Sequence, residues 1–384
     1  MKSNKIRLGE QCVVTSSKRF HLSERITQGV PFYCSKEIIK KLNGEDVTEC
    51  DYISEDLYKK VSNEFGVPKE NDLLITTRGT IGIPYLYKRT DRFYFADGNL
   101  TWIKDFDSNL YSKFLYYWFQ SYEGRKKFEA LAKGTAQKAV PISGIKTLEI
   151  ELPPLKSQKR IADILSAYDD LIENNQKQIK LLEEAAQRLY KEWFVDLRFP
   201  GHENTKIVDG VPEGWRRGLL QELISVNYGK DHKKAPDDGN IPVYGSGGLM
   251  RKCNKSLFSG EAVLIPRKGS LNNIMYVDET FWTVDTMFYA TMKQPHTAVF
   301  VYFFVKAFDM YSMNIGAAVP SMTAKILDAM DVVIPDKETL EKFDKCAKMY
   351  FNKIRTLQGQ NERLKMARDL LLPKLMYETR KGDF

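Results

Sequence analysis

The strongest constraint in this sequence is a long helical pattern that occurs twice. Mostly apolar and aromatic side chains follow one another at alternating spacings of four and three residues, as in a coiled-coil seam. Each copy also contains one asparagine, and the second contains one arginine. The first copy contains Ile161, Leu165, Tyr168, Ile172, Asn175, Ile179, Leu182, Ala186, Leu189 and Trp193. The second contains Phe343, Ala347, Tyr350, Ile354, Leu357, Asn361, Leu364, Arg368, Leu371 and Leu375, each 182 residues after its counterpart. The chain is therefore built from one module that is used twice.

Each helical pattern follows a globular part that also repeats, more loosely. Thr76-Thr77-Arg78-Gly79-Thr80 resembles Pro266-Arg267-Lys268-Gly269-Ser270 at an offset of 190 residues. Short β-branched runs, together with aromatic-rich stretches at 110–120 and 298–308, predict an α+β fold for both globular parts. The expected segments are a first head at 1–155, a central helix at 156–200, a second head at 201–336 and a distal helix at 337–384.

The two helices are expected to pair with each other. The 33 residues from Ile161 to Trp193 span about 50 Å, and the second head can return the chain to the far end, which favours antiparallel pairing. A buried asparagine needs a polar partner and fixes the alignment when it finds one, so we expect Asn175 opposite Asn361. This register pairs Ile172 with Leu364, Leu165 with Leu371, Ala186 with Tyr350, Trp193 with Phe343 and Tyr168 with Arg368. In the alternative, both asparagines lie at a solvated edge.

The composition is that of a globular protein without a membrane segment. Hydrophobic residues make up 43% of the 384 residues, and the net charge is mildly basic at +8. No apolar run approaches the roughly 18 residues of a membrane span, and the first residues do not resemble a signal peptide. The five scattered cysteines and four histidines favour reduced thiols and no metal site. We therefore expect a cytoplasmic protein.

The sequence lacks recognisable catalytic motifs. It contains no phosphate-binding GxxxxGK[ST] loop, and Gly245-Ser246-Gly247-Gly248 lacks the spacing of a dinucleotide-binding loop. Leu152-Pro153-Pro154-Leu155 lacks the polar first and aromatic last residue of the amino-methyltransferase motif. Asp169-Asp170 is interpreted as a pair of solvent-facing charges. We therefore expect no catalytic residues and no metal ligands in this chain.

Binding chemistry remains, carried by loops that combine hydroxyl groups, basic side chains and glycines. Such loops suit contacts to phosphates and base edges. Any single basic loop is more often simply solvated, but the recurrence in both halves strengthens the joint case. The candidate DNA-contacting residues are Thr76, Thr77, Arg78, Thr80, Gln137, Lys138, Lys230, Lys233, Lys234, Ser246, Arg251, Lys252, Arg267, Lys268 and Ser270.

The whole chain resembles the specificity subunits of type I restriction–modification systems. The motifs that carry the resemblance are Leu152-Pro153-Pro154-Leu155 with Gln158-Lys159-Arg160-Ile161-Ala162, Leu189 to Asp196, Pro212-Glu213-Gly214-Trp215, Ile241 to Gly248, and Arg368 to Met376. The resemblance implies that each head is a target recognition domain that reads one half of a bipartite, asymmetric DNA site.

The resemblance also implies partners. The coiled coil would set the gap between the half-sites and dock two methyltransferase subunits, and restriction/translocase subunits would join for ATP-dependent cleavage. This chain itself would be non-catalytic and carry no cofactor, whereas S-adenosylmethionine, ATP and Mg would bind the partner subunits. Two alternatives stay open, namely a coiled-coil adaptor that does not bind DNA and a stand-alone methyltransferase.

Overall fold

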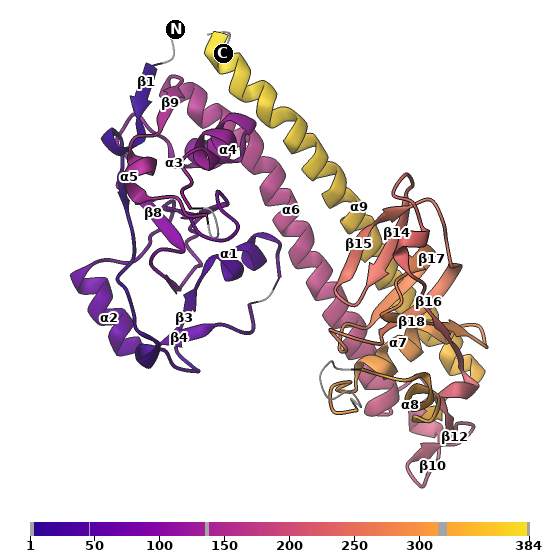
Figure 1. The fold of residues 1–384 in the computed structure, drawn as a ribbon. Helices are drawn as coiled ribbons and strands as arrows, with labels where there is room; N and C mark the ends of the chain where they lie inside the picture. The colour runs from indigo at the N-terminus through magenta and orange to yellow at the C-terminus, as the bar shows by residue number, and fades with distance from the viewer. Residues whose placement is uncertain (1–3, 46, 135–137, 314–320, 382–384) are drawn as a thin grey trace. The chain divides into compact units, whose positions relative to one another are not determined.

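The computed structural model describes residues 4–45, 47–134, 138–313 and 321–381, and the chain divides into two compact units (Figure 1). The first unit comprises residues 1–177 and 358–384, and the second comprises residues 178–357. Each unit contains one α+β head and a stretch of both long helices, α6 (Leu155–Tyr190) and α9 (Lys337–Lys381). The expected class, two α+β heads with an antiparallel helix pair, is confirmed.

The first head is built from short strands and helices. Its strands are β1 (Asn4–Arg7), β2 (Val13–Thr15), β3 (Val30–Tyr33), β4 (Asp51–Ile53), β5 (Leu73–Thr76), β6 (Pro84–Leu86), β7 (Tyr94–Phe95), β8 (Leu100–Lys104) and β9 (Glu149–Leu152). Its helices are α1 (Ser35–Leu42), α2 (Glu55–Glu64), α3 (Ser112–Gln120), α4 (Tyr122–Glu129) and α5 (Ile142–Lys146). The main sheet has the order β2-β8-β5-β6, a smaller one has the order β4-β3-β7, and β1 pairs with β9.

Strand β5 lies between β8 and β6 in the main sheet, and its side chains are buried on both faces. Leu73 and Ile75 join the core under α3, and Leu74 points into a second core that contains Trp102. Since successive strand residues point to opposite faces, one short apolar run serves both cores. This arrangement fixes the point at which the chain leaves the sheet after Thr76.

The second head follows the same plan with longer strands. Its strands are β10 (Ile207–Val208), β11 (Val211–Pro212), β12 (Arg216–Leu219), β13 (Ile224–Tyr228), β14 (Ile241–Gly245), β15 (Gly248–Cys253), β16 (Phe258–Pro266), β17 (Met275–Thr283), β18 (Met287–Met292) and β19 (Asp331–Ile334). Its helices are α7 (Ala298–Lys306) and α8 (Ala324–Asp328). The main sheet has the order β13-β18-β16-β17-β14-β15, and β12 pairs with β19.

Strand β16 has the place in this head that β5 has in the first. Val263 and Ile265 belong to the core that includes Phe300 of α7, whereas Ala262 and Leu264 belong to the core on the other face. The aromatic-rich stretches at 110–120 and 298–308 are mostly helical, since they contain α3 and α7.

In the first unit, α6 and α9 run antiparallel. The Asn175 side-chain amide donates to the Asn361 carbonyl oxygen at 2.9 Å, and both residues are buried. Arg368 makes an ion pair with Asp169, and the Tyr117 hydroxyl of α3 donates to the same carboxylate at 2.6 Å. The interpretation of Asp169 as a solvated charge is therefore wrong. The Asp169 carboxylate attracts Arg368 more strongly than the ring of Tyr168, its expected partner, would. Through Tyr117 and Arg368, Asp169 links the head to both helices.

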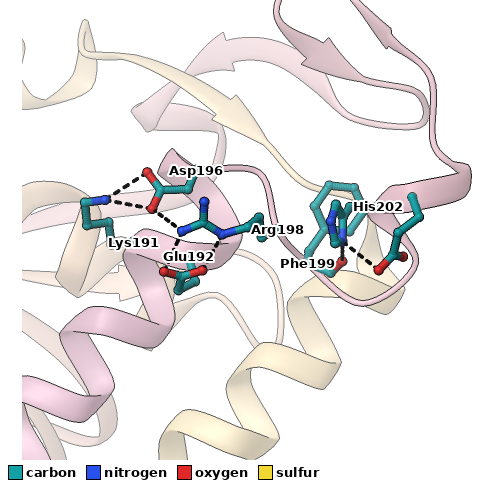
Figure 2. Close-up of polar contacts among 7 residues, drawn as sticks. Lys191, Glu192, Asp196, Arg198, Phe199 and His202 are labelled. Carbon is teal, nitrogen blue, oxygen red and sulfur yellow. Dashed lines mark hydrogen bonds and ion pairs between the residues drawn. The ribbon is translucent and has the colours of Figure 1, made fainter.

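In the second unit, α6 meets the beginning of α9 and ends in a π-helical turn, Lys191–Val195. The rings of Trp193 and Phe343 lie 5.8 Å apart, as the antiparallel register expects. Lys191 is paired with Asp196, while Arg198 is paired with Glu192 and also with Asp196, so these ion pairs hold the turn that follows the helix (Figure 2). Leu197 lies between them in the left-handed region, with φ of 56°.

The described residues bear on three further expectations, concerning membrane spans, thiols and metal sites. None of their helices combines the length and the apolar character needed to cross a bilayer. The five cysteines are all free thiols. Across the described part of the chain, no three His, Cys, Asp or Glu side chains gather where they could bind a metal ion.

Candidate nucleic-acid interface

The loop that leaves β5 in the first head is closed by Thr76. The Thr76 hydroxyl is buried and accepts a hydrogen bond from the Ile83 amide at 2.9 Å. The Thr76 carbonyl accepts another from the Gly82 amide at 2.8 Å. This corrects the expectation for Thr76, because its side chain shapes the loop from inside and is not accessible to DNA.

The next two residues are clamped by two other segments of the head. The Thr77 amide donates to the Asn99 carbonyl at 2.8 Å, and the Thr77 carbonyl accepts from the Val140 amide at 3.0 Å. Arg78 forms an antiparallel bridge with Ala139. The Thr77 side chain is almost fully buried, whereas Arg78 and Thr80 are exposed. The loop thus presents a guanidinium and a hydroxyl on a fixed backbone.

The clamp also joins the loop to the second basic candidate segment. Lys133 and Ala139 exchange backbone hydrogen bonds of 2.8 and 2.9 Å, and Lys138 is exposed beside them. Gln137 lies outside the described residues. A cavity of about 320 Å³ opens between the segments, with Ser16, Thr77, Arg78, Gly98, Thr101, Lys133, Ala139, Val140, Pro141 and Ile142 as its lining. The hydroxyl and basic groups here suit a phosphate or a base edge.

The loop that leaves β16 in the second head has the same backbone clamp. The Arg267 amide donates to the Thr286 carbonyl at 2.8 Å, and the Arg267 carbonyl accepts from the Met322 amide at 2.9 Å. Lys268 forms an antiparallel bridge with Ser321. Lys268 and Ser270 are exposed, and Arg267 is half-buried.

The two clamps correspond position by position. Thr77 is equivalent to Arg267, Arg78 to Lys268, and Val140 to Met322, which again lies 182 residues later. Gly79 and Gly269 follow in the same left-handed conformation, with φ of 74° and 84°. A residue with a Cβ atom is strained in this region, so both loops use glycine to make the turn. The repeat therefore preserves the loop scaffold, while the side chains on it differ.

Further groups gather around the loop of the second head. The β14–β15 turn reaches it, because the Asn273 side-chain amide donates to the Ser246 carbonyl at 2.9 Å and a Cβ atom on Gly269 would lie 2.8 Å from the Ser246 hydroxyl. Lys230 is exposed, and its amide donates to Thr283 at 2.9 Å. Lys230 and Arg267 both bond to the end of β17 and the turn after it, through the Thr283 and Thr286 carbonyls, and Ser246 lies against Gly269 of the loop.

Arg251 is a structural residue. Its guanidinium is paired with Asp237 and donates to the carbonyls of His232 and Ala235 at 2.5 and 2.8 Å. These bonds tie the segment between β13 and β14 to β15, which gives Arg251 a structural role, while its contact with DNA stays a prediction. Its neighbour Lys252 is exposed.

Lys233 and Lys234 lie on the segment that Arg251 holds. Both are exposed on a short 3-10 turn that begins after Asp231, whose carboxylate accepts from the Lys233 amide at 3.0 Å. They stay candidates for phosphate contact, together with Lys252.

Tyr228 was not among the candidates, although it lies next to them. The guanidinium of Arg267 is 5.4 Å from the centre of the Tyr228 ring, and Tyr228 is 53% exposed. Its place two residues before Lys230 was the available signal, since aromatic side chains accompany basic ones at nucleic-acid interfaces.

The repeated scaffold agrees with comparisons with known proteins. The Type I restriction modification DNA specificity domain matches residues 2–184 and 212–366. The MjaIX specificity subunit of Methanocaldococcus jannaschii is 26% identical over 307 residues, which cover 69% of this chain and 68% of the relative. The HindI specificity subunit of Haemophilus influenzae is 23% identical over 362 residues, with 69% and 76% covered.

A solved structure shares the fold. The type I restriction–modification S subunit from M. genitalium matches with a TM-score of 0.60 and 19% identity over 98% of this chain and 99% of the other. The family domain covers most of both heads and most of both long helices of the present chain. The chain therefore belongs to the specificity subunits of type I restriction–modification systems.

Proposed function

We propose that this specificity subunit reads a bipartite, asymmetric DNA site with one head for each half-site. The observation that carries the proposal is the backbone clamp that recurs at Thr77–Arg78 and Arg267–Lys268. A duplicated scaffold that holds exposed basic and hydroxyl side chains suits two similar encounters with a duplex. The side chains at equivalent positions differ, so the two half-sites differ as well.

The paired helices would set the gap between the half-sites and dock two methyltransferase subunits. Both long helices carry exposed apolar side chains on the surface that faces away from the other helix. Leu171, Met366 and Leu370 are between 51% and 65% exposed in the first unit. Such exposed apolar side chains favour a protein partner.

The division of labour follows from this arrangement. The chain would act without catalytic residues of its own, and S-adenosylmethionine, ATP and Mg would be held by the methyltransferase and restriction/translocase subunits. Within the chain, the groups brought together around the clamped loops are donors for binding rather than an acid–base pair.

The test is DNA binding by the chain reconstituted with its methyltransferase subunits. We expect specific binding whose affinity falls with increasing salt, because cationic side chains release counterions from the phosphates. A Lys268→Ala/Lys230→Ala double variant should have a shallower salt dependence than the wild type. Absence of binding to any duplex at low salt would contradict the proposal and favour a coiled-coil adaptor.

Docking on the helices is tested separately by size-exclusion chromatography of the mixed subunits. Met366→Glu and Leu370→Glu should weaken assembly, because each places a charge in an apolar contact. Lys365→Glu is the matched control, since it makes a larger charge change at an exposed position of the same turn. Equal assembly by all three variants would rule out this surface as the docking site.

A further inference from the structure

The equivalent loop positions Thr77 and Arg267 differ in what they offer to a ligand. The Thr77 hydroxyl points back to the Gly98 carbonyl, at 3.5 Å, and its residue is only 3% exposed. The Arg267 guanidinium points to the equivalent carbonyl, that of Asp285, at 3.2 Å, but its longer side chain extends over the Tyr228 ring. The same backbone position is therefore closed in the first head and open in the second.

Tyr228 forms a firm platform for this guanidinium. It ends β13, where it pairs with Phe288 of β18, and the two rings are 5.0 Å apart in an edge-on arrangement. The next residue, Gly229, leaves no space for a side chain, because a Cβ atom there would lie 2.0 Å from the Val284 carbonyl oxygen. The backbone around Tyr228 is thus packed tightly against the turn that also holds Arg267.

The contacts of Arg267 leave most of its hydrogen-bonding capacity for a ligand. Among the residues that the structure describes, its side chain makes one hydrogen bond, to Asp285. Arg251, on the same head, uses its guanidinium for several bonds to the protein. An arginine has five N–H donors, so, with respect to the described residues, Arg267 keeps a face with free donors while the ring restricts its orientation.

We propose that Arg267, positioned by Tyr228, reads a guanine in the half-site of the second head. This rests on the proposed function, and adds the residue, its positioning partner and the base. A guanidinium fork matches the O6 and N7 acceptors of guanine in the major groove. The guanidinium is planar by itself, and contact with an aromatic ring restricts its orientation before DNA arrives. The first head has a closed threonine at this position, so it lacks this contact and uses Arg78 one residue later.

The experiment maps methylated adenines across a genome in cells that express this chain with its methyltransferase subunits. The chain is compared as wild type, Arg267→Ala, Arg267→Lys, Tyr228→Ala and Tyr228→Phe. Arg217→Ala is the matched control, because Arg217 is an exposed arginine of the same head whose side chain bonds to the Asp209 carbonyl, outside the loop.

We expect the wild-type motif to contain a guanine that Arg267→Ala relaxes, with a loss of about 5- to 150-fold in the preference for that base. Arg267→Lys should relax the same base, because lysine keeps the charge but lacks the fork. Tyr228→Ala should relax the preference for this base partly, because the ring that orients Arg267 is lost. Tyr228→Phe should keep the wild-type preference, because it keeps the ring and loses only the hydroxyl. The other half-site and the Arg217→Ala motif should stay unchanged.

Two outcomes overturn the inference. The motif could stay unchanged in Arg267→Ala while the complex remains active, or the relaxed base could be other than guanine. Failure of the proposed function is different, because the wild-type complex would then produce no bipartite motif at all.

Discussion

The Asn175 side-chain amide donates a hydrogen bond of 2.9 Å to the Asn361 side-chain carbonyl, and both residues are only 7% exposed. The pair forms a polar layer inside an otherwise mainly apolar helix seam. In an antiparallel register shifted by one heptad, at least one of the two asparagines would face an apolar side chain, Leu182 or Ile354, and the two would no longer meet. The pair therefore selects one alignment of α6 and α9 in the first unit, at a cost in stability that a matched apolar layer would not have.

Replacement of one asparagine should cost more stability than replacement of both. Asn175→Leu leaves the buried side-chain carbonyl oxygen of Asn361 without its donor, with an expected loss of about 1–3 kcal/mol in the free energy of unfolding. The Asn175→Leu/Asn361→Leu double variant should recover most of this loss. Urea unfolding monitored by circular dichroism measures both. A double variant less stable than either single variant would show that the pair acts other than through mutual hydrogen bonding.

Arg251 should be a stability residue, and Lys252 should not. Arg251→Ala removes charged hydrogen bonds to the carbonyls of His232 and Ala235, each typically worth about 1.5–3 kcal/mol. Lys252→Ala changes an exposed side chain and should stay within about 0.5 kcal/mol of the wild type. Thermal unfolding compares the two variants. If they unfold at the same temperature, the structural role assigned to Arg251 is wrong.

Asp336 should make the folding stability of the second head depend on pH. Burial on its own would raise the pKa of Asp336, but hydrogen bonds from Thr339, at 2.6 and 3.0 Å, and from the Trp215 ring, at 3.0 Å, outweigh it and lower the pKa. A lowered pKa in the folded state gives stability that is present above the unfolded pKa, about 3.9, and is lost as the pH falls through the folded value.

Trp215→Phe tests this pH dependence, because it removes one of those hydrogen bonds and keeps an aromatic ring. The variant should be less stable than the wild type at pH 7, and the difference should shrink when the pH falls below about 4. Urea unfolding at a series of pH values measures it. A difference that stays constant from pH 7 to pH 3 would mean that only the packing of the ring matters.

Arg78 should affect one half-site only. Arg78→Ala removes the exposed guanidinium of the first clamped loop, and should weaken or relax that half-site by about 1–3 kcal/mol if Arg78 reads a base. Thr80→Ala is a milder change on the same loop. Binding to duplexes mutated in either half-site provides the measurement. Equal effects on both half-sites would show that Arg78 acts on the assembly as a whole.

The two long helices and the loop scaffold could be predicted from the sequence, because both depend on local patterns. The heptad spacing identified α6 and α9, and the glycine after a strand marked Gly79 and Gly269 as equivalent. The roles of individual polar side chains depend on distant segments. Arg251 reads as part of a basic run, and only the fold brings the His232 and Ala235 carbonyls to it. From the sequence, Thr76 likewise looks like an exposed hydroxyl, and only the fold brings the Ile83 amide to it.

The central claim, that two heads on a helical spacer read two half-sites, is tested most directly by changing the spacer alone. One heptad is removed from both helices, residues 176–182 and 354–360, and methylated adenines are mapped in cells that also express the methyltransferase subunits. These segments lie opposite each other in the antiparallel register, so the remaining layers stay matched. The account predicts the same bases in both half-sites and a different number of base pairs between them. Altered half-site bases with an unchanged gap would contradict it.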